Sequence, residues 1–188
     1  VNDVGEAVRT NVESSYRRGV ELEAQSPVTK QLQVGGNLTL SENKIESITE
    51  FVGEWTGTYG QISNTYNNTN ISFSPEVIGM ALLQYKAGKN TVLYCNVKYV
   101  GHQYLDNTEF EGRKLEAFST VNFALQHVLN VSKQAPITLG VYINNCLNAQ
   151  YAPNGYTYSG YIEGQRQDFN YLYPMAGRNI MLKAKLRI

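Results

Sequence analysis

Several features are scarce in this sequence of 188 residues. Apolar runs are short throughout, and none approaches the length of about 20 residues that a membrane-spanning helix needs. Sixteen basic residues are balanced by sixteen acidic ones, which leaves a formal net charge of zero. No stretch of Lys and Arg offsets this balance locally, so nucleic acid is not expected as a partner. If the protein meets a membrane, it must do so through strands.

Histidine is also scarce, with only two residues. His102 and His127 are expected at opposite ends of a sheet, so neither a shared metal site nor a catalytic triad is predicted. Asp106 and Glu109 lie near His102 in the sequence, but no nucleophile accompanies them. We therefore expect no catalytic residue, no metal site and no cofactor. A hydrolase carried on a barrel stays an alternative, and it would need an acid, a base and a nucleophile clustered at one end of the sheet.

Cysteine likewise occurs only twice. Cys95 lies in the fourth predicted strand and Cys146 follows the sixth, so the fifth strand is expected to separate them. Two strands that flank a third lie about 9–10 Å apart, beyond the roughly 7 Å limit on the Cα distance of a disulfide. Two free thiols are expected.

The sequence is rich in alternation of apolar and polar residues, which is typical of strands with one apolar face. Near the C-terminus, Leu182 and Leu186 alternate with Lys183 and Lys185. The same pattern predicts seven strands, at about 14–25, 30–41, 76–86, 91–104, 115–130, 137–144 and 180–188. The second strand is expected to continue toward Phe51.

The alternation also predicts which residues share a face. The residues expected on the outer, convex face are Val20, Leu38, Val97, Leu125, Val141 and Leu182. Those expected on the concave face are Glu21, Asn37, Lys98, Gln126, Asn144 and Lys183.

The connections between these strands alternate strictly in length. Tight turns are predicted at 26–29, 87–90 and 131–136, and long connections at 52–75, 105–114 and 147–178. Up-and-down membrane barrels have this asymmetry between their two ends. The sequence therefore predicts an all-β fold, a single antiparallel meander that does not close on itself. The alternative is a soluble carbohydrate-binding sandwich, in which a second layer would cover the apolar face.

Several segments, in order, carry a family resemblance. They are SSYRRGVELEAQ, LQVGGNLTLSENKI, SPEVIGMALLQYKAGKN, VKYVGHQYLDNTE, VYINNCLNAQYAPNGYTYSG and YPMAGRNIML. Together they resemble the C-terminal third of TonB-dependent outer-membrane receptors, most closely those of the Bacteroidetes kind. The resemblance covers almost the whole chain. One departure is Ile188, where the family usually ends in an aromatic residue.

The resemblance implies a function and a set of partners. Residues 1–188 would form the last seven or so strands of a 22-stranded transmembrane β-barrel, without the N-terminal plug and the earlier strands. Such receptors lie in the bacterial outer membrane, among lipid and lipopolysaccharide. They take up a ferric siderophore, haem, cobalamin or a glycan with energy relayed by TonB, which contacts the N-terminal part. They are not enzymes.

Aromatic residues in the long connections are the candidates for ligand capture. The candidate residues are Trp55, Tyr59, Tyr66, Tyr156, Tyr158, Tyr161 and Arg166. Flat aromatic faces and one cation suit catecholate siderophores, haem or sugars alike. The alternative is that these aromatic side chains only pack one connection against another.

Overall fold

The structure, a computed structural model, describes residues 11–55, 60–130 and 135–187. Its elements are β1 (Ser15–Pro27), β2 (Leu32–Glu54), β3 (Gly60–Asn70), β4 (Val77–Lys86), β5 (Thr91–Val100), β6 (Gln103–Tyr104), the 3-10 helix η1 (Glu111–Arg113), β7 (Lys114–Leu115), β8 (Phe118–Leu129), β9 (Ile137–Asn144), β10 (Gly155–Ile162), β11 (Gln165–Leu172) and β12 (Asn179–Leu186). Across these ranges, no helix has the length and apolar character needed to cross a membrane.

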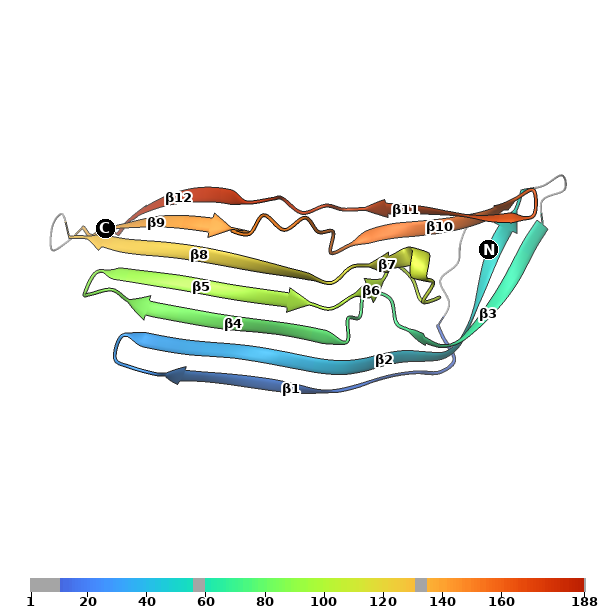
Figure 1. Ribbon diagram of the computed structural model, residues 1–188, viewed down its shortest axis with the longest axis horizontal. Coiled ribbons are helices and arrows are strands. Elements are labelled where there is room, and N and C mark those ends of the chain that lie inside the picture. Colours follow the sequence, from blue (N-terminus) through green and yellow to red (C-terminus); the bar gives the residue numbers. More distant parts are fainter. Residues whose placement is uncertain (1–10, 56–59, 131–134, 188) are drawn as a thin grey trace.

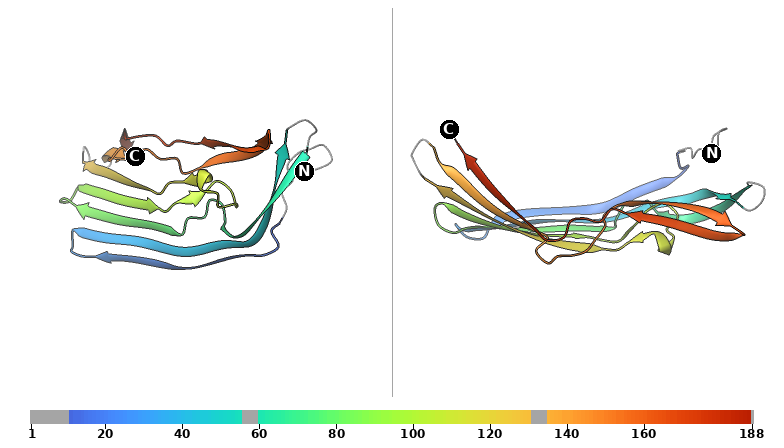
Figure 2. Two further views of the ribbon diagram at one scale, coloured as in Figure 1. Left: turned by 45° about the vertical axis from the view of Figure 1, so that its right-hand side comes forward. Right: turned by 90° about the horizontal axis from the view of Figure 1, so that it is seen from above.

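Seven of these strands form one antiparallel meander. β1, β2, β4, β5, β8, β9 and β12 pair in sequence order, each with the next (Figure 1). They correspond to the seven strands predicted from the sequence, and β2 continues past Phe51 as expected. The sheet is curled and twisted rather than flat (Figure 2). The predicted meander is therefore confirmed.

The register of the pairs confirms the predicted faces. Directly opposed residues in a sheet point to the same side, and Leu125 lies opposite Val141, which lies opposite Leu182. On the other side, Lys98 lies opposite Met80, which lies opposite Asn37. The six residues predicted for the apolar face share one side, and the six predicted for the polar face share the other.

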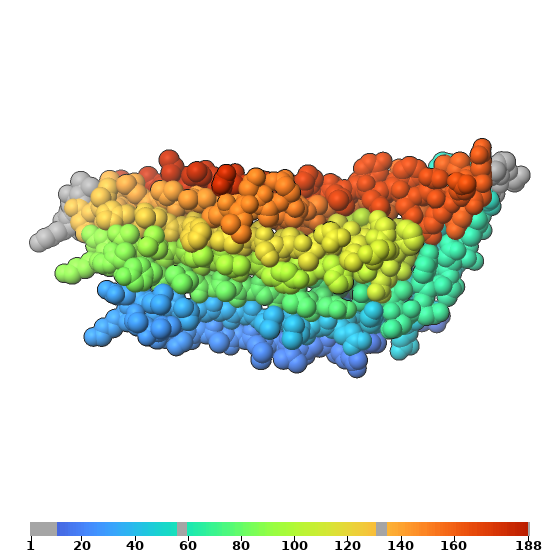
Figure 3. Space-filling view, in the orientation of Figure 1, coloured from blue at the N-terminus to red at the C-terminus, as the bar shows by residue number. Residues whose placement is uncertain are grey.

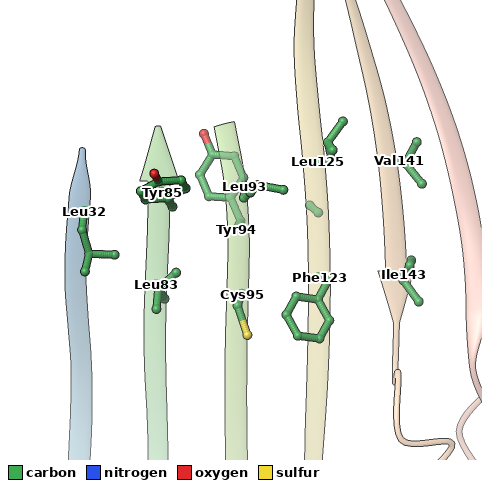
Figure 4. A pocket seen from close by; sticks show the side chains of 11 residues that line it. Leu32, Leu83, Tyr85, Leu93, Tyr94, Cys95, Phe123, Leu125, Val141 and Ile143 are labelled. Atoms are coloured by element: carbon green, nitrogen blue, oxygen red, sulfur yellow. The ribbon is translucent and has the colours of Figure 1, made fainter. Parts of the chain in front are cut away.

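The apolar face is not covered by a second layer in the part of the chain that the structure describes. The strands of the meander lie open to view from β1 to β9 in Figure 3. Leu182 is 75% exposed and Leu125 is 39% exposed. An open apolar groove of about 580 Å³ runs across β2, β4, β5, β8 and β9, with Leu83, Leu93 and Phe123 in its lining (Figure 4). A sandwich requires a second sheet here, and the only other sheet of the described residues is the short pair β6 and β7.

The two ends of the sheet differ. At one end, here called the turn end, short connections join β1 to β2 and β4 to β5, and Gly88 adopts a φ of 85° in the second of these turns. The third tight turn was predicted at 131–136, of which 131–134 lie outside the described residues. The opposite end, here called the loop end, carries the long connections and most of the buried residues in the described part of the chain. The buried apolar residues are Ile45, Val52, Val100, Tyr104, Leu105 and Leu115.

The long connections were predicted as loops, and this prediction is wrong. The first contains β3, the second contains the 3-10 helix η1, and the third contains β10 and β11. The sequence of β3, GQISNTYNNTN, is polar on both faces, so it lacks the apolar alternation by which strands were identified. Its backbone pairs with the extended end of β2 from Lys44 to Glu54, and this pairing defines it as a strand.

The two cysteines and the two histidines lie where the sequence predicted them. Cys95 and Cys146 are free thiols. His127 lies at the turn end, where its Nδ1 is 2.8 Å from Thr91 Oγ1, whereas His102 lies at the loop end with its ring edge-on to Tyr104. The two histidines are therefore at opposite ends of the sheet.

Candidate functional site

The β10–β11 hairpin returns to the first long connection. Gly160 and Tyr161 of β10 pair in parallel with Gly53 and Glu54 at the tip of β2, and the amide of Trp55 donates to the carbonyl of Tyr161 at 2.9 Å. This parallel contact was not predicted from the sequence. It joins the hairpins β2–β3 and β10–β11 at their tips, which meet at the right of Figure 1.

Arg113 of η1 lies between these two hairpins and is 1% exposed. Its guanidinium donates to Glu50 of β2 at 3.0 Å and to Asp168 of β11 at 2.6 Å. It also contacts Asp106, in its own connection, and Ser159 of β10. One buried cation thus has acceptors in the β2–β3 hairpin, which includes the first long connection, and in the second and third long connections.

Arg166 of β11 completes this group of charges. Its two terminal nitrogens contact both oxygens of Glu50, at 2.9 and 3.0 Å, and its Nε lies 3.1 Å from Asp168. The Tyr66 hydroxyl donates to Glu50 and accepts from Arg166, each at 3.2 Å. Two guanidiniums and three carboxylates therefore form one group, here called the ion cluster and composed of Glu50, Asp106, Arg113, Arg166 and Asp168.

The charged forms of these groups are stabilised by one another. Burial acts to raise the pKa of Glu50, but hydrogen bonds from Arg166 and Arg113 outweigh it and hold the pKa below its usual range. The pKa of Asp168 is lowered in the same way: burial opposes the shift, and hydrogen bonds from Ser159 and Arg113 produce it. Burial and the adjacent Glu50 carboxylate raise the pKa of the Tyr66 hydroxyl, which stays protonated.

These pKa shifts predict an acid-sensitive loop end. A carboxyl whose pKa is lowered by folding adds stability above its unfolded pKa, and this stability is lost as the pH falls through the folded value. Glu50 and Asp168 should therefore stabilise the loop end at neutral pH and cease to do so below the usual carboxyl range of about 4. We expect amide hydrogen exchange in residues 155–172, corrected for intrinsic rates, to speed up in acid relative to β5. Equal protection of both segments at pH 7 and in acid would contradict this.

Other hydrogen bonds tie the middle connection to its neighbours. Glu109 accepts from the backbone amide of Asn70 at 2.7 Å and from its side chain at 3.1 Å, which links this connection to β3. Asn170 of β11 donates to the carbonyl of Gly112 at 2.8 Å. The middle connection is thus held between the two hairpins by neutral as well as charged contacts.

The opposite face of the β10–β11 hairpin carries a row of exposed aromatic rings. Tyr156 lies opposite Tyr171 and Tyr158 lies opposite Phe169, and in both pairs the rings stack with centroids 4.9 Å apart. Tyr173 extends the row, 6.0 Å from Tyr156. All five of these rings are exposed, and Tyr158 is 53% exposed.

Trp55 continues this row across to the end of β2. A Cβ placed on Gly160 would lie 3.6 Å from the indole nitrogen of Trp55, so the indole lies over this glycine. Gly160 follows Tyr158 by two residues and shares its face. The indole itself is 71% exposed. Six rings therefore form one surface, here called the aromatic strip: Trp55, Tyr156, Tyr158, Phe169, Tyr171 and Tyr173.

The structure divides the residues that were predicted for ligand capture. Trp55, Tyr156 and Tyr158 come together in the aromatic strip. Arg166 instead belongs to the ion cluster on the other face, where it is paired with Glu50 and Asp168, and Tyr66 contacts the cluster there. The remaining two are Tyr161, which is half-buried and joins β10 to β2, and Tyr59, which lies outside the described residues.

Sequence reasoning missed half of the aromatic strip and most of the ion cluster. Phe169 and Tyr171 alternate with the polar residues Asp168 and Asn170, and this alternation was available as a signal. Glu163 and Gly164 between the two strands have φ values of 51° and 73°, as in a two-residue hairpin turn that favours glycine. Recognising that turn would have paired the tyrosines of β10 with the aromatic residues of β11.

Over the described residues, no group of three or more His, Cys, Asp or Glu side chains is placed to hold a metal ion. The carboxylates of the ion cluster face guanidiniums instead. The arrangement can do two things: present flat aromatic faces to a ligand, and hold three connections together.

Comparison with known proteins gives matches in structure alone. No protein-family model and no curated protein sequence matches the chain. The siderophore receptor PiuA from Acinetobacter baumannii is similar with a TM-score of 0.67 and 15% identity, over 90% of this chain and 21% of PiuA. The ferric citrate transporter FecA is similar with a TM-score of 0.51 and 14% identity, over 89% of this chain and 30% of FecA.

These similarities concern the fold. The chain spans less than a third of either protein, and the shared part is the curled antiparallel sheet. The chain therefore has the fold of a segment of the β-barrel of TonB-dependent siderophore receptors.

Proposed function

We propose that this chain is the C-terminal part of an outer-membrane receptor barrel that takes up a ferric siderophore or another large, scarce nutrient, such as haem, cobalamin or a glycan. The observation that carries the proposal is the seven-strand meander with one uncovered apolar face and one polar face. The similarity to the barrels of PiuA and FecA supports it. Residues 1–188 would be one segment of the barrel, completed by an N-terminal plug and earlier strands.

The uncovered face fits lipid better than water. A broad exposed apolar surface on a soluble protein drives association, whereas hydrocarbon is a suitable solvent for it. Strands that pair along their length satisfy their backbone groups without water, as a membrane requires. The polar face, with Lys98, Asn96 and Gln126, would then line a wet lumen. Lipid and lipopolysaccharide would surround the barrel in the bacterial outer membrane.

The aromatic strip is the best-supported surface for ligand contact at the loop end. Its rings are exposed and nearly parallel within each stacked pair, at 11° for Tyr156 and Tyr171 and 20° for Tyr158 and Phe169. Flat ligands with aromatic or sugar rings can stack on such a surface. In this role the strip binds and performs no chemistry, and TonB would supply the energy for transport through the plug.

Loss of the aromatic strip should reduce uptake and leave the barrel intact. In the intact receptor, the combined change Trp55→Ala, Tyr158→Ala and Phe169→Ala removes the centre of the strip. We expect uptake of an iron-loaded catecholate siderophore, followed with radioactive iron, to fall by about tenfold or more, since each lost ring contact is worth about 1 kcal/mol. Heat-modifiable migration of the outer-membrane fraction should be unchanged.

A matched control is Tyr85→Ala, which removes an exposed ring at the turn end. It should leave uptake unchanged. Haem and an oligosaccharide are tested in parallel as the other ligand classes. If the triple variant took up every one of these ligands at the parent rate, ligand capture by the aromatic strip would be excluded.

A further inference from the structure

We propose that Arg113 is a latch that fixes the three long connections into one rigid unit and thereby sets the position of the aromatic strip. Arg113 is not part of the aromatic strip, and its guanidinium donates to side chains of the protein. It would act on the strip through the β10–β11 hairpin, as a positioning residue. The role of Arg113 as a latch does not depend on the proposed uptake function. The expected effect of the latch on uptake does rest on that proposed function.

The first argument is the placement of acceptors around one buried cation. The guanidinium of Arg113 contacts Glu50 in the β2–β3 hairpin, Asp106 in the second connection and Asp168 in the third. The fork of donors on a guanidinium can bind several carboxylates at once, whereas an ammonium is a point charge. Three segments far apart in the sequence therefore meet at a single side chain.

The second argument is charge. The ion cluster holds two guanidiniums and three carboxylates. Without Arg113, Arg166 alone would face Glu50, Asp106 and Asp168 in a partly buried site, where like charges repel more strongly than in water. Loss of this one cation would therefore change the net charge of the ion cluster from −1 to −2 and leave Arg166 as its one cation. The attraction between the connections would weaken, and the distance between them would become less defined.

The third argument is the short backbone contact between the β10–β11 hairpin and β2, to which the side chain of Arg166 adds its pair with Glu50. Its ladder with β2 consists of two residue pairs, at Gly160 and Tyr161. Ser159 and Asp168, which contact Arg113, lie on one face of the hairpin. Tyr158 and Phe169, their sequence neighbours, lie on the other face, in the aromatic strip. Contacts to Arg113 on one face of the hairpin thus set the orientation of the face that carries the aromatic strip.

Arg113 also differs from the other cation of its connection. Lys114 pairs with Glu111, three residues earlier in the same connection, at 2.8 Å. That pair joins no two connections. Lys114 is therefore a matched control, a neighbouring cation whose ion pair does not link separate segments.

The test measures a distance in the intact receptor. In a background in which Cys95 and Cys146 are replaced by Ser, spin labels are attached through Asn67→Cys on β3 and Gln167→Cys on β11, both at exposed positions. Pulsed electron paramagnetic resonance then gives the distribution of distances between the two hairpins. The parent and Lys114→Met should give one narrow distribution, whereas Arg113→Met should broaden it at least twofold and Arg113→Lys should give an intermediate width.

Because replacing a buried residue can prevent folding, Asp168→Asn serves as a second variant. It keeps the shape of the side chain and removes one charge that Arg113 contacts. It should broaden the distribution less than Arg113→Met does, and heat-modifiable migration checks that each barrel is assembled. A narrow, unshifted distribution in an assembled Arg113→Met or Asp168→Asn receptor would overturn the latch.

Uptake measured on the same variants separates the two proposals. A broadened distribution together with reduced siderophore uptake supports both the latch and the role of the aromatic strip. A broadened distribution with uptake at the parent rate supports the latch and counts against ligand capture by the strip. A distribution as narrow as that of the parent overturns the latch, whatever the uptake.

Discussion

Truncation of the receptor before β12, at Gly177, should abolish barrel assembly. β12 pairs with β9 over eight residues, from Asn179 opposite Asn144 to Leu186 opposite Ile137. Its removal would leave the edge of β9 and the edge of the first barrel strand unpaired in lipid. Each unsatisfied backbone group there costs several kcal/mol. The sum over two unpaired strand edges therefore exceeds the 5–15 kcal/mol by which a typical protein is stabilised. Heat-modifiable migration and protease resistance of the outer-membrane fraction measure the effect.

The control for this truncation keeps the backbone and changes the polar face. Lys183→Gln and Lys185→Gln together alter side chains of β12 that share the side of Gln126 and Gly140. Because the ladder with β9 remains, the double variant should assemble like the parent. A truncated receptor that still formed a heat-modifiable barrel would show that β12 is not a spanning strand.

A charge placed on the apolar face should strongly destabilise the barrel. Phe123 lies near the middle of β8, opposite Cys95 and Ile143, and lines the open apolar groove. In the intact receptor, Phe123→Lys should lower the free energy of unfolding in a bilayer by about 2–4 kcal/mol, the cost of a lysine at the membrane midplane. Urea titration of the folded receptor in lipid vesicles measures this difference.

Ala124 provides the control at the same depth. It lies opposite Tyr94 and Tyr142 on the polar face, so Ala124→Lys would place its ammonium in a wet lumen. We expect a change below about 1 kcal/mol for this variant. Equal destabilisation by both substitutions would mean that the two faces meet the same solvent, and the barrel interpretation would fail.

The two ends of the sheet would serve different purposes in such a receptor. The middle of the meander has its backbone paired and its apolar side open, which suits a wall in lipid. The loop end holds the buried side chains, the ion cluster and the aromatic strip. Loops outside a membrane are free of the hydrogen-bonding demand of the hydrocarbon, so they can carry recognition. Here that recognition surface would be a sheet with fixed geometry.

The sequence by itself determined the seven strands of the meander. In β8 and β12 the alternation of apolar and polar residues decides both the type of element and the face of each residue, because side chains in a strand change sides at every step. Tight turns then force neighbouring strands to pair. Seven strands, their order and their faces follow from these local rules, together with the two free thiols.

Only the tertiary structure decided the arrangement of the loop end. β3 shows no apolar alternation, and its strand character comes from the long ladder with β2. Arg166 is a cation in a polar connection, and nothing near it in the sequence reveals that Glu50, 116 residues earlier, is its partner. The aromatic strip likewise forms only because the tips of two hairpins meet. Local patterns determine which segments become strands of the meander, whereas contacts between distant segments depend on the path of the whole chain.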